Sequence, residues 1–299
     1  MKSRSLSGSA YIDFPVDRTV IYPDYRRNTV ELGKIQATID SVRNDRDVTI
    51  MSVWLKGFAS PESPYKHNTE LAIGRTAALK KHIGQLYHFA DSIIRTDYEP
   101  EDWEGLRRYV EQSNINHRKE ILSLIDSDME PDAKEAKIKR TYPKEYRFML
   151  QHFYPALRHT DYRIDYNIRT FSDVEEIKHI MAEQPQKLSQ NEFYLVAGKY
   201  EPGTDEFTDV FETAVRMFPN DEVANLNAAN AAIRRDDFAT ARRYLDKAGD
   251  SAEAVYARGA LAVREKDYDT AHRYLETARD MGLEKAAATL KELEERRKE

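Results

Sequence analysis

The sequence contains no cysteine, so disulfide bonds, thiolate metal sites and cysteine nucleophiles are excluded. It also lacks long apolar runs. No segment approaches the roughly 20 apolar residues that cross a bilayer, and the start, MKSRSLSGSAYIDF, has no apolar core of a signal peptide. A formal net charge of −6 argues against a general nucleic-acid binder. What is present, 299 residues of which 40% are hydrophobic and 33% charged, suffices for one large globular domain or two ordinary ones.

The first half of the chain mixes strand and helix patterns. Runs rich in β-branched and aromatic residues predict strands, and apolar residues at helical spacing predict helices. The second predicted strand is apolar on both faces, which suits an interior strand covered on both sides. In chain order, the predicted elements are strand 9–14, helix 29–42, strand 47–58, a helix that begins near Tyr65, strand 92–98, a polar helical enlargement of about 100–155, and an alternating, half-buried strand 162–169.

After Phe171 the strand signal ends, and helical periodicity rich in alanine continues to the C-terminus. Segments 236–250 and 266–280 match at an offset of 30 residues, and a weaker copy precedes them at an offset of 34. Small residues at the matched positions let antiparallel helices pair closely, and Gly249 predicts an early helix end. This array resembles the tetratricopeptide repeat, which has a period of 34 residues. Segment 283–299 has one apolar face and is expected to cap the stack.

The stretch GFASPESPYKHNTELAIGRTAAL, residues 57–79, joins a predicted strand to a predicted helix. Within it, Asn68, Leu71 and Arg75 fall at the spacing of the signature Asn-x-x-Leu-Ser-x-x-Arg-Ala, after Gly-Phe in place of Gly-Tyr. Together with the element order and the closing strand YRIDYNI, they make residues 8–171 similar to the OmpA C-terminal domain family. That family includes peptidoglycan-associated lipoproteins and flagellar-motor stator proteins. The resemblance implies an α+β sandwich of βαβαβ type, here interrupted by the helical enlargement.

In that family the site binds the diaminopimelate-type stem peptide of peptidoglycan, with a loop Asp taking the ammonium group and the helix Arg taking the carboxylate. An Arg suits a planar carboxylate, and residues seven apart share one stripe of a helix. Here Ser60 stands where the Asp is expected, and a neutral hydroxyl cannot pair the charge of an ammonium group. Glu62 is the hypothesised replacement. The ligand residues implied by the resemblance are Ser60, Glu62, Asn68, Leu71, Arg75 and Arg163.

Three interpretations of this site stay open at the level of sequence. In the first, affinity for peptidoglycan is retained. In the second, Asn68 braces the loop or caps the helix and Arg75 pairs with a surface acid, so that the fold persists without the affinity. In the third, the pocket has shifted to another ligand. Pro61 and Pro64 stiffen the loop in every case, because each fixes its own φ.

The repeats offer a second candidate site. Proteins of this kind hold peptides in a concave groove, often through Asn and basic residues on the first helix of each unit. The alternative is a solvated helix face without a ligand. By register, the expected groove residues are Asn227, Asn230, Arg234 and Arg264.

Catalytic motifs are missing from the sequence. There is no Gly-x-Ser-x-Gly, P-loop or dinucleotide-binding glycine pattern, and the eight histidines form no zinc-binding pair. We therefore expect no enzymatic activity, no cofactor and no metal.

The expected protein has an OmpA-like domain over 1–172 and a tetratricopeptide-like array over 173–299. The resemblance implies a periplasmic, outer-membrane-associated protein that would need an export signal upstream of this chain. Its first domain would bind peptidoglycan or organise the outer membrane, and its repeats would dock a partner protein. The alternative is an assembly scaffold in which the first domain has lost peptidoglycan binding.

Overall fold

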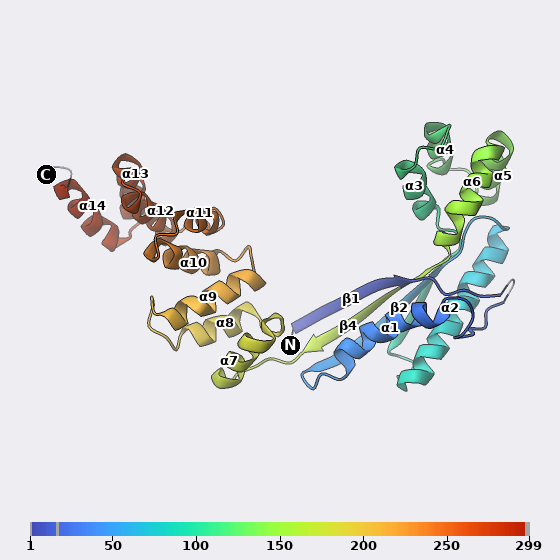
Figure 1. The fold of residues 1–299 in the computed structure, drawn as a ribbon, viewed down its shortest axis with the longest axis horizontal. Helices are drawn as coiled ribbons and strands as arrows, with labels where there is room; N and C mark the ends of the chain where they lie inside the picture. The colour runs from blue at the N-terminus through green and yellow to red at the C-terminus, as the bar shows by residue number, and fades with distance from the viewer. Residues whose placement is uncertain (1, 16–17, 297–299) are drawn as a thin grey trace. The chain divides into compact units, whose positions relative to one another are not determined.

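The computed structural model describes residues 2–15 and 18–296, and the protein is of mixed α+β class (Figure 1). Within these residues there are fourteen α-helices and one four-stranded sheet. The chain forms two compact units, residues 1–169 and 170–299. Among the described helices, none has the combined length and apolarity that a bilayer crossing requires.

The first unit is built on a mixed sheet whose last strand in chain order lies inside it. The strand order is β1-β4-β2-β3, with β4 antiparallel to both β1 and β2, and with β3 parallel to β2. The elements that form the sheet and its covering layer are β1 (Lys2–Ala10), α1 (Asn28–Arg43), β2 (Val48–Phe58), α2 (Tyr65–Tyr87), β3 (Ile94–Glu99) and β4 (Thr160–Ile168).

Helices α1 and α2 cover one face of this sheet and make its core. Apolar residues of both helices, among them Ile35 and Ile83, pack with Val53, Leu55 and Ile164 from the central strands. These helices and the alternating last strand agree with the sequence periodicity. The predicted covering of β2 on both sides was wrong. On its second face Trp54 and Lys56 are only half-buried, and the Arg163 guanidinium lies over the Trp54 ring at 5.6 Å.

The first strand also differs from the prediction. It spans Lys2–Ala10 rather than 9–14, and pairs with β4 along its whole length, from Lys2 opposite Ile168 to Ala10 opposite Thr160. Its serine-rich sequence has weak strand propensity, but a continuous ladder of backbone hydrogen bonds overrides that preference. Residues 11–14 leave the sheet, and their side chains become available for other contacts.

The helical enlargement predicted between the third and fourth strands is present and has a core of its own. Residues such as Leu106, Ile121, Ile138 and Met149 are fully buried in it. Its elements are α3 (Trp103–Gln112), α4 (Arg118–Ile125), α5 (Pro131–Thr141), α6 (Pro143–His152) and the 3-10 turn Tyr154–Leu157.

The second unit is entirely helical. Helices α10 and α12 begin 30 residues apart, as do α11 and α13, and Ala229, Ala241 and Ala271 are buried where the helices pair. Helix α11 is shorter than α13, and Gly249 after it adopts a φ of +67°, as the early stop requires. The elements are α7 (Val174–Glu183), the 3-10 turn Pro185–Lys187, α8 (Gln190–Ala197), α9 (Asp205–Met217), α10 (Glu222–Arg234), α11 (Phe238–Leu245), α12 (Ala252–Arg264), α13 (Tyr268–Asp280) and α14 (Glu284–Arg296).

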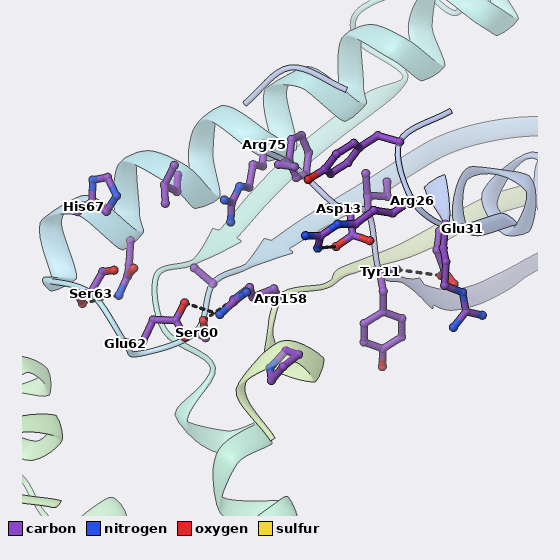
Figure 2. A pocket seen from close by; sticks show the side chains of 18 residues that line it. Tyr11, Asp13, Arg26, Glu31, Ser60, Glu62, Ser63, His67, Arg75 and Arg158 are labelled. Atoms are coloured by element: carbon purple, nitrogen blue, oxygen red, sulfur yellow. Dashed lines mark hydrogen bonds and ion pairs between the residues drawn. The ribbon is translucent and has the colours of Figure 1, made fainter. Parts of the chain in front are cut away.

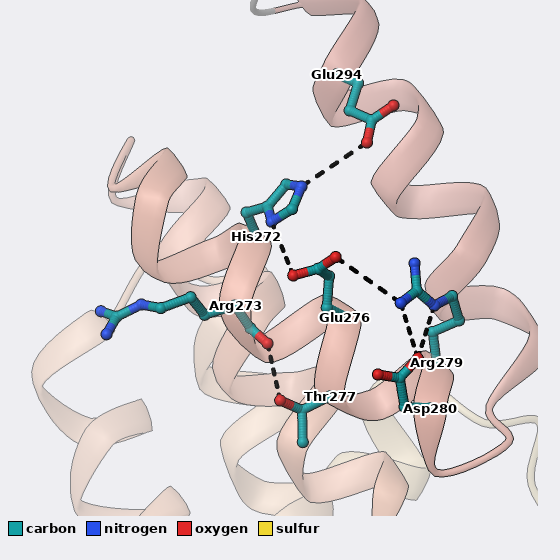
Figure 3. Close-up of polar contacts among 7 residues, drawn as sticks. All are labelled: His272, Arg273, Glu276, Thr277, Arg279, Asp280 and Glu294. Atoms are coloured by element: carbon teal, nitrogen blue, oxygen red, sulfur yellow. Dashed lines mark hydrogen bonds and ion pairs between the residues drawn. The ribbon is translucent and has the colours of Figure 1, made fainter.

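Helix α14 closes the described part of this unit. Its Leu290 and Leu293 are buried beside Leu275, which agrees with the apolar face expected of a capping segment. One contact of charged groups also connects it to α13: His272 Nε2 lies 3.7 Å from Glu294 Oε1, which makes an ion pair when the histidine is protonated (Figure 3). Such exposed pairs contribute little, so apolar burial holds the helix in place. The last three residues of the predicted cap lie outside the described residues.

Candidate ligand-binding site

A cavity of about 540 Å³ opens at the end of β2 where the chain turns into α2 (Figure 2). Five of the six ligand residues expected from the sequence line it: Ser60, Glu62, Asn68, Leu71 and Arg75. The remaining lining comes from the segment after β1, the residues before and in the first turn of α1, the loop after β2 with the start of α2, and the end of the enlargement. It comprises Tyr11–Phe14, Tyr25–Arg27, Glu31, Ala59, Ser63, His67, Pro155 and Arg158.

A close contact between β2 and α2 sets the position of Arg75. Gly57 in β2 has no side chain, and any Cβ there would collide with Thr76 Oγ1 and lie 3.2 Å from the Ala72 carbonyl oxygen. The helix can therefore lie directly against the strand. Arg75 precedes Thr76, and its guanidinium lies 5.2 Å from the centre of the Phe14 ring, at the cavity wall.

Helix α2 begins at Tyr65, as predicted, but Asn68 acts as a brace. Its side chain is only 3% exposed, and its Nδ2 donates to the Ser63 carbonyl at 2.7 Å and to Glu101 Oε1 at 2.8 Å. The Tyr65 N–H donates to Asp132 Oδ1 of the enlargement at 2.8 Å. Asn68 thus holds the loop in place, as the second of the three interpretations has it for Asn68.

Ser60 and Glu62 hold an arginine that the sequence did not single out. Arg158 Nε donates to the buried Ser60 Oγ at 2.9 Å, and its Nη2 makes a close ion pair with Glu62. The hypothesised replacement acid therefore already has a cationic partner. Arg158 could have been found only from topology: Thr160 of β4 pairs with Gly57, so the residues just before β4 lie beside the loop after β2.

Arg163 does not line the cavity. It lies on the open face of the sheet, where its side chain is exposed, stacks over Trp54 and contacts Asp165 with an Nε–Oδ1 distance of 3.1 Å. Successive residues of a strand point to opposite faces of the sheet. Tyr162 and Ile164 point toward α1 and α2, so Arg163 points to the other face.

Charged groups in the cavity favour an anion. Four arginines line it against three acids, which are Asp13, Glu31 and Glu62. Glu31 is buried and accepts from the Tyr11 N–H at 3.0 Å and from Lys34 Nζ at 2.6 Å. Burial alone would raise the pKa of Glu31, but these donors outweigh it and lower that pKa. The cationic excess makes the cavity attractive to a carboxylate-bearing ligand.

Buried carboxylates tie the enlargement to the cavity loop. Glu101 accepts from Asn68 and, at 2.8 Å, from Trp103 Nε1, while Asp102 caps α3 by accepting from the Gly105 N–H at 2.8 Å. The Asp102 N–H in turn donates to the Ala59 carbonyl. Burial raises the pKa of both carboxyl groups. The enlargement thus supports the loop from behind.

In the second unit, three of the four predicted groove residues bond to their own scaffold. Asn227, Asn230 and Arg234 share one stripe of α10, at spacings of three and four residues. Asn227 donates to the Val223 carbonyl of its own helix, and Arg234 donates to Thr208 at 3.1 Å. Arg264 Nε donates to Asp236 Oδ1 at 3.0 Å, in the turn between α10 and α11.

No group of three or more His, Asp or Glu side chains is arranged to hold a metal ion within residues 2–15 and 18–296. No protein-family model matches the chain, and neither does any curated protein. What the cavity binds must be inferred from its own residues.

Proposed function

We propose that the first unit is a non-catalytic binding module whose cavity takes an amino-acid-like end of the peptidoglycan stem peptide. The observation that carries this proposal is Arg75, which stands at the signature spacing and lines a cavity with an excess of cationic side chains. A guanidinium offers paired donors to a planar carboxylate and stays charged at any physiological pH. The carboxylate of a diaminopimelate-type residue is the ligand group that fits.

The cavity also has the size and rigidity of a binding site. Its volume of about 540 Å³ lies within the usual range of roughly 300–1,000 Å³ for small-molecule sites. The Asn68–Glu101 and Ser60–Arg158 hydrogen bonds fix its loop before a ligand arrives, which lowers the entropy lost on binding. Arginine-rich walls supply recognition rather than acid–base chemistry, since arginine does not exchange protons near neutral pH.

The second unit would dock a partner protein, and the whole chain would serve as a periplasmic anchor or organiser at the outer membrane. This part of the proposal follows the resemblance of the sequence and the regular helix pairs of α10 to α13. The polar stripe Asn227–Arg234 is the surface offered for docking.

A second candidate function is an assembly scaffold without affinity for peptidoglycan. One observation favours it: Arg158 already pairs with Glu62, so the Glu62 carboxylate would have to give up this partner to bind an ammonium group. The experiment below separates the two functions.

Purified peptidoglycan sacculi should retain the wild-type protein in a sedimentation assay. Loss of a charge-assisted carboxylate contact, about 1.5–3 kcal/mol, should weaken retention of Arg75→Ala by roughly 10- to 100-fold. Arg163→Ala is the matched control, because it removes an arginine of the same unit that lies outside the cavity. No retention of the wild type would contradict peptidoglycan binding and favour the scaffold, and equal retention of all three proteins would show that Arg75 does not make the contact.

A further inference from the structure

Three acids line the cavity, and they differ in how firmly their charges are held. Glu31 is buried between the Tyr11 N–H and Lys34. Glu62 is in close contact with Arg158, which also bonds the buried Ser60. A ligand cation would have to break established contacts to reach either carboxylate. The third acid, Asp13, is held differently.

The backbone of Asp13 is fixed while its carboxylate is left in the cavity. Fully buried Asn28 accepts from the Asp13 N–H at 2.7 Å and donates to the Asp13 carbonyl at 2.9 Å. The same Asn28 Nδ2 donates to the Tyr22 carbonyl at 2.9 Å. This bonding on both sides orients the residue without using its side chain. The segment after β1 is thereby held as a wall of the site.

The carboxylate of Asp13 has one weakly held cationic partner, Arg26. Its Oδ1 lies 3.4 Å from Arg26 Nη1, and the two side chains are 37% and 63% exposed. Exposed ion pairs of this kind contribute little, because water and salt screen them. An incoming ammonium group can therefore displace Arg26 at small cost. Figure 2 shows Asp13 and Arg75 on facing walls of the same cavity.

We propose that Asp13 supplies the anion that receives the ligand's ammonium group, and that Asp13 and Arg75 together select a zwitterionic amino-acid end. This inference rests on the proposed function, and it moves the acidic role from the loop after β2 to the segment after β1. A ligand that carried only carboxylates would gain from Arg75 but would face the uncompensated charge of Asp13. Discrimination between zwitterion and plain anion is thus assigned to Asp13.

Isothermal titration calorimetry with two probes tests this assignment. The probes are meso-diaminopimelate and pimelate, which has the same chain and carboxylates but no amino groups. The wild type should prefer diaminopimelate. Asp13→Asn keeps the shape and removes the charge, so its affinity for diaminopimelate should fall by roughly tenfold or more while its affinity for pimelate is kept or rises.

Further variants make the result specific. Asp165→Asn is the matched control, because it removes an acid of the same unit that lies outside the cavity, and it should bind diaminopimelate within about twofold of the wild type. Glu62→Gln tests the acid of the loop after β2, and it should keep the preference for diaminopimelate over pimelate. Arg26→Ala removes the competing cation and should tighten diaminopimelate binding, and this gain should vanish in the Asp13→Asn background.

The outcomes separate this inference from the function on which it rests. If the wild type binds neither diaminopimelate nor sacculi, the proposed function fails and this inference fails with it. If the wild type binds diaminopimelate but Asp13→Asn binds it equally well, Asp13 is not the acceptor, while the proposed function stands. A large loss in Glu62→Gln would return the acidic role to the loop after β2.

Discussion

The two units bury different kinds of side chain. Among the described residues, eleven polar or charged residues are buried in the first unit, and three in the second. Those of the first unit include Asn28, Asn68 and Glu101, which bond to loop backbone or to one another. In the second unit, by contrast, small apolar residues are buried, and alanines dominate the contacts between helices.

The difference follows from what each unit has to hold in place. A cavity bounded by irregular segments needs its loop carbonyls and N–H groups satisfied from behind, and buried side chains provide that. Stacked helices satisfy their own backbone, so their packing is decided by how closely two axes can approach. The first unit should therefore respond more sharply than the second to loss of single buried polar groups.

The largest expected effect comes from Asn28. Asn28→Ala removes three hydrogen bonds and leaves backbone groups of the loop unpaired, so the first unit should lose about 2–3 kcal/mol of stability. Asn225→Ala is the counterpart in the second unit, where Nδ2 bonds the Pro219 and Asp221 carbonyls, and about 1 kcal/mol is expected. Amide hydrogen exchange, which reports each unit separately, is the measurement. Equal losses of stability in Asn28→Ala and Asn225→Ala would contradict the proposed difference between the two units.

Glycine contacts should give the next effect. Gly57→Ala forces α2 away from β2, because the new Cβ meets Thr76 Oγ1 and the Ala72 backbone; we expect a loss of about 2 kcal/mol. Gly259→Ala brings its Cβ to 2.9 Å from Leu275 Cγ, a side chain that can shift, and about 1 kcal/mol or less is expected. Thermal unfolding followed by circular dichroism would compare them, and a larger loss in Gly259→Ala would contradict this order.

The smallest effect concerns pH, and one helix-cap aspartate in each unit should respond with opposite sign. Burial raises the pKa of Asp102 above its ordinary 3.8, so its stabilising contribution is complete below pH 3.8 and is lost as the pH rises through the folded-state value. Hydrogen bonds from Thr270 lower the pKa of the exposed helix cap Asp267, so its contribution is present above pH 3.8 and lost as the pH falls.

Asp102→Asn and Asp267→Asn keep an N-cap oxygen but remove the titration, and they make the matched pair. Relative to wild type, the first variant should gain stability as the pH rises from 4 to 7. The second should gain stability as the pH falls below 3.8. Urea unfolding with hydrogen exchange across this range is the measurement. Slopes of the same sign in both variants would refute the assignment.

Sequence periodicity predicted most elements, because helix and strand spacing depends on local burial. The spacing of Asn68, Leu71 and Arg75 also located the cavity. The spacing could not show that Asn68 bonds to Glu101 or that Arg158 pairs with Glu62. Both contacts involve residues at the two ends of the enlargement, far from the loop in sequence. Asp13 was missed for a related reason: residues 9–14 look like a strand, and only the pairing of β1 with β4 shows where the strand ends.

The inner position of β4 has a consequence for synthesis. In the order β1-β4-β2-β3, β4 lies between β1 and β2 and pairs with both, and it begins only at Thr160. As the chain leaves the ribosome, β1 has no sheet neighbour until the whole enlargement has been made. Pairing partners so distant in sequence slow folding and leave strand edges exposed in the meantime. A nascent chain that stops before Ile168 should therefore depend on chaperones, and the enlargement sets how long that interval lasts.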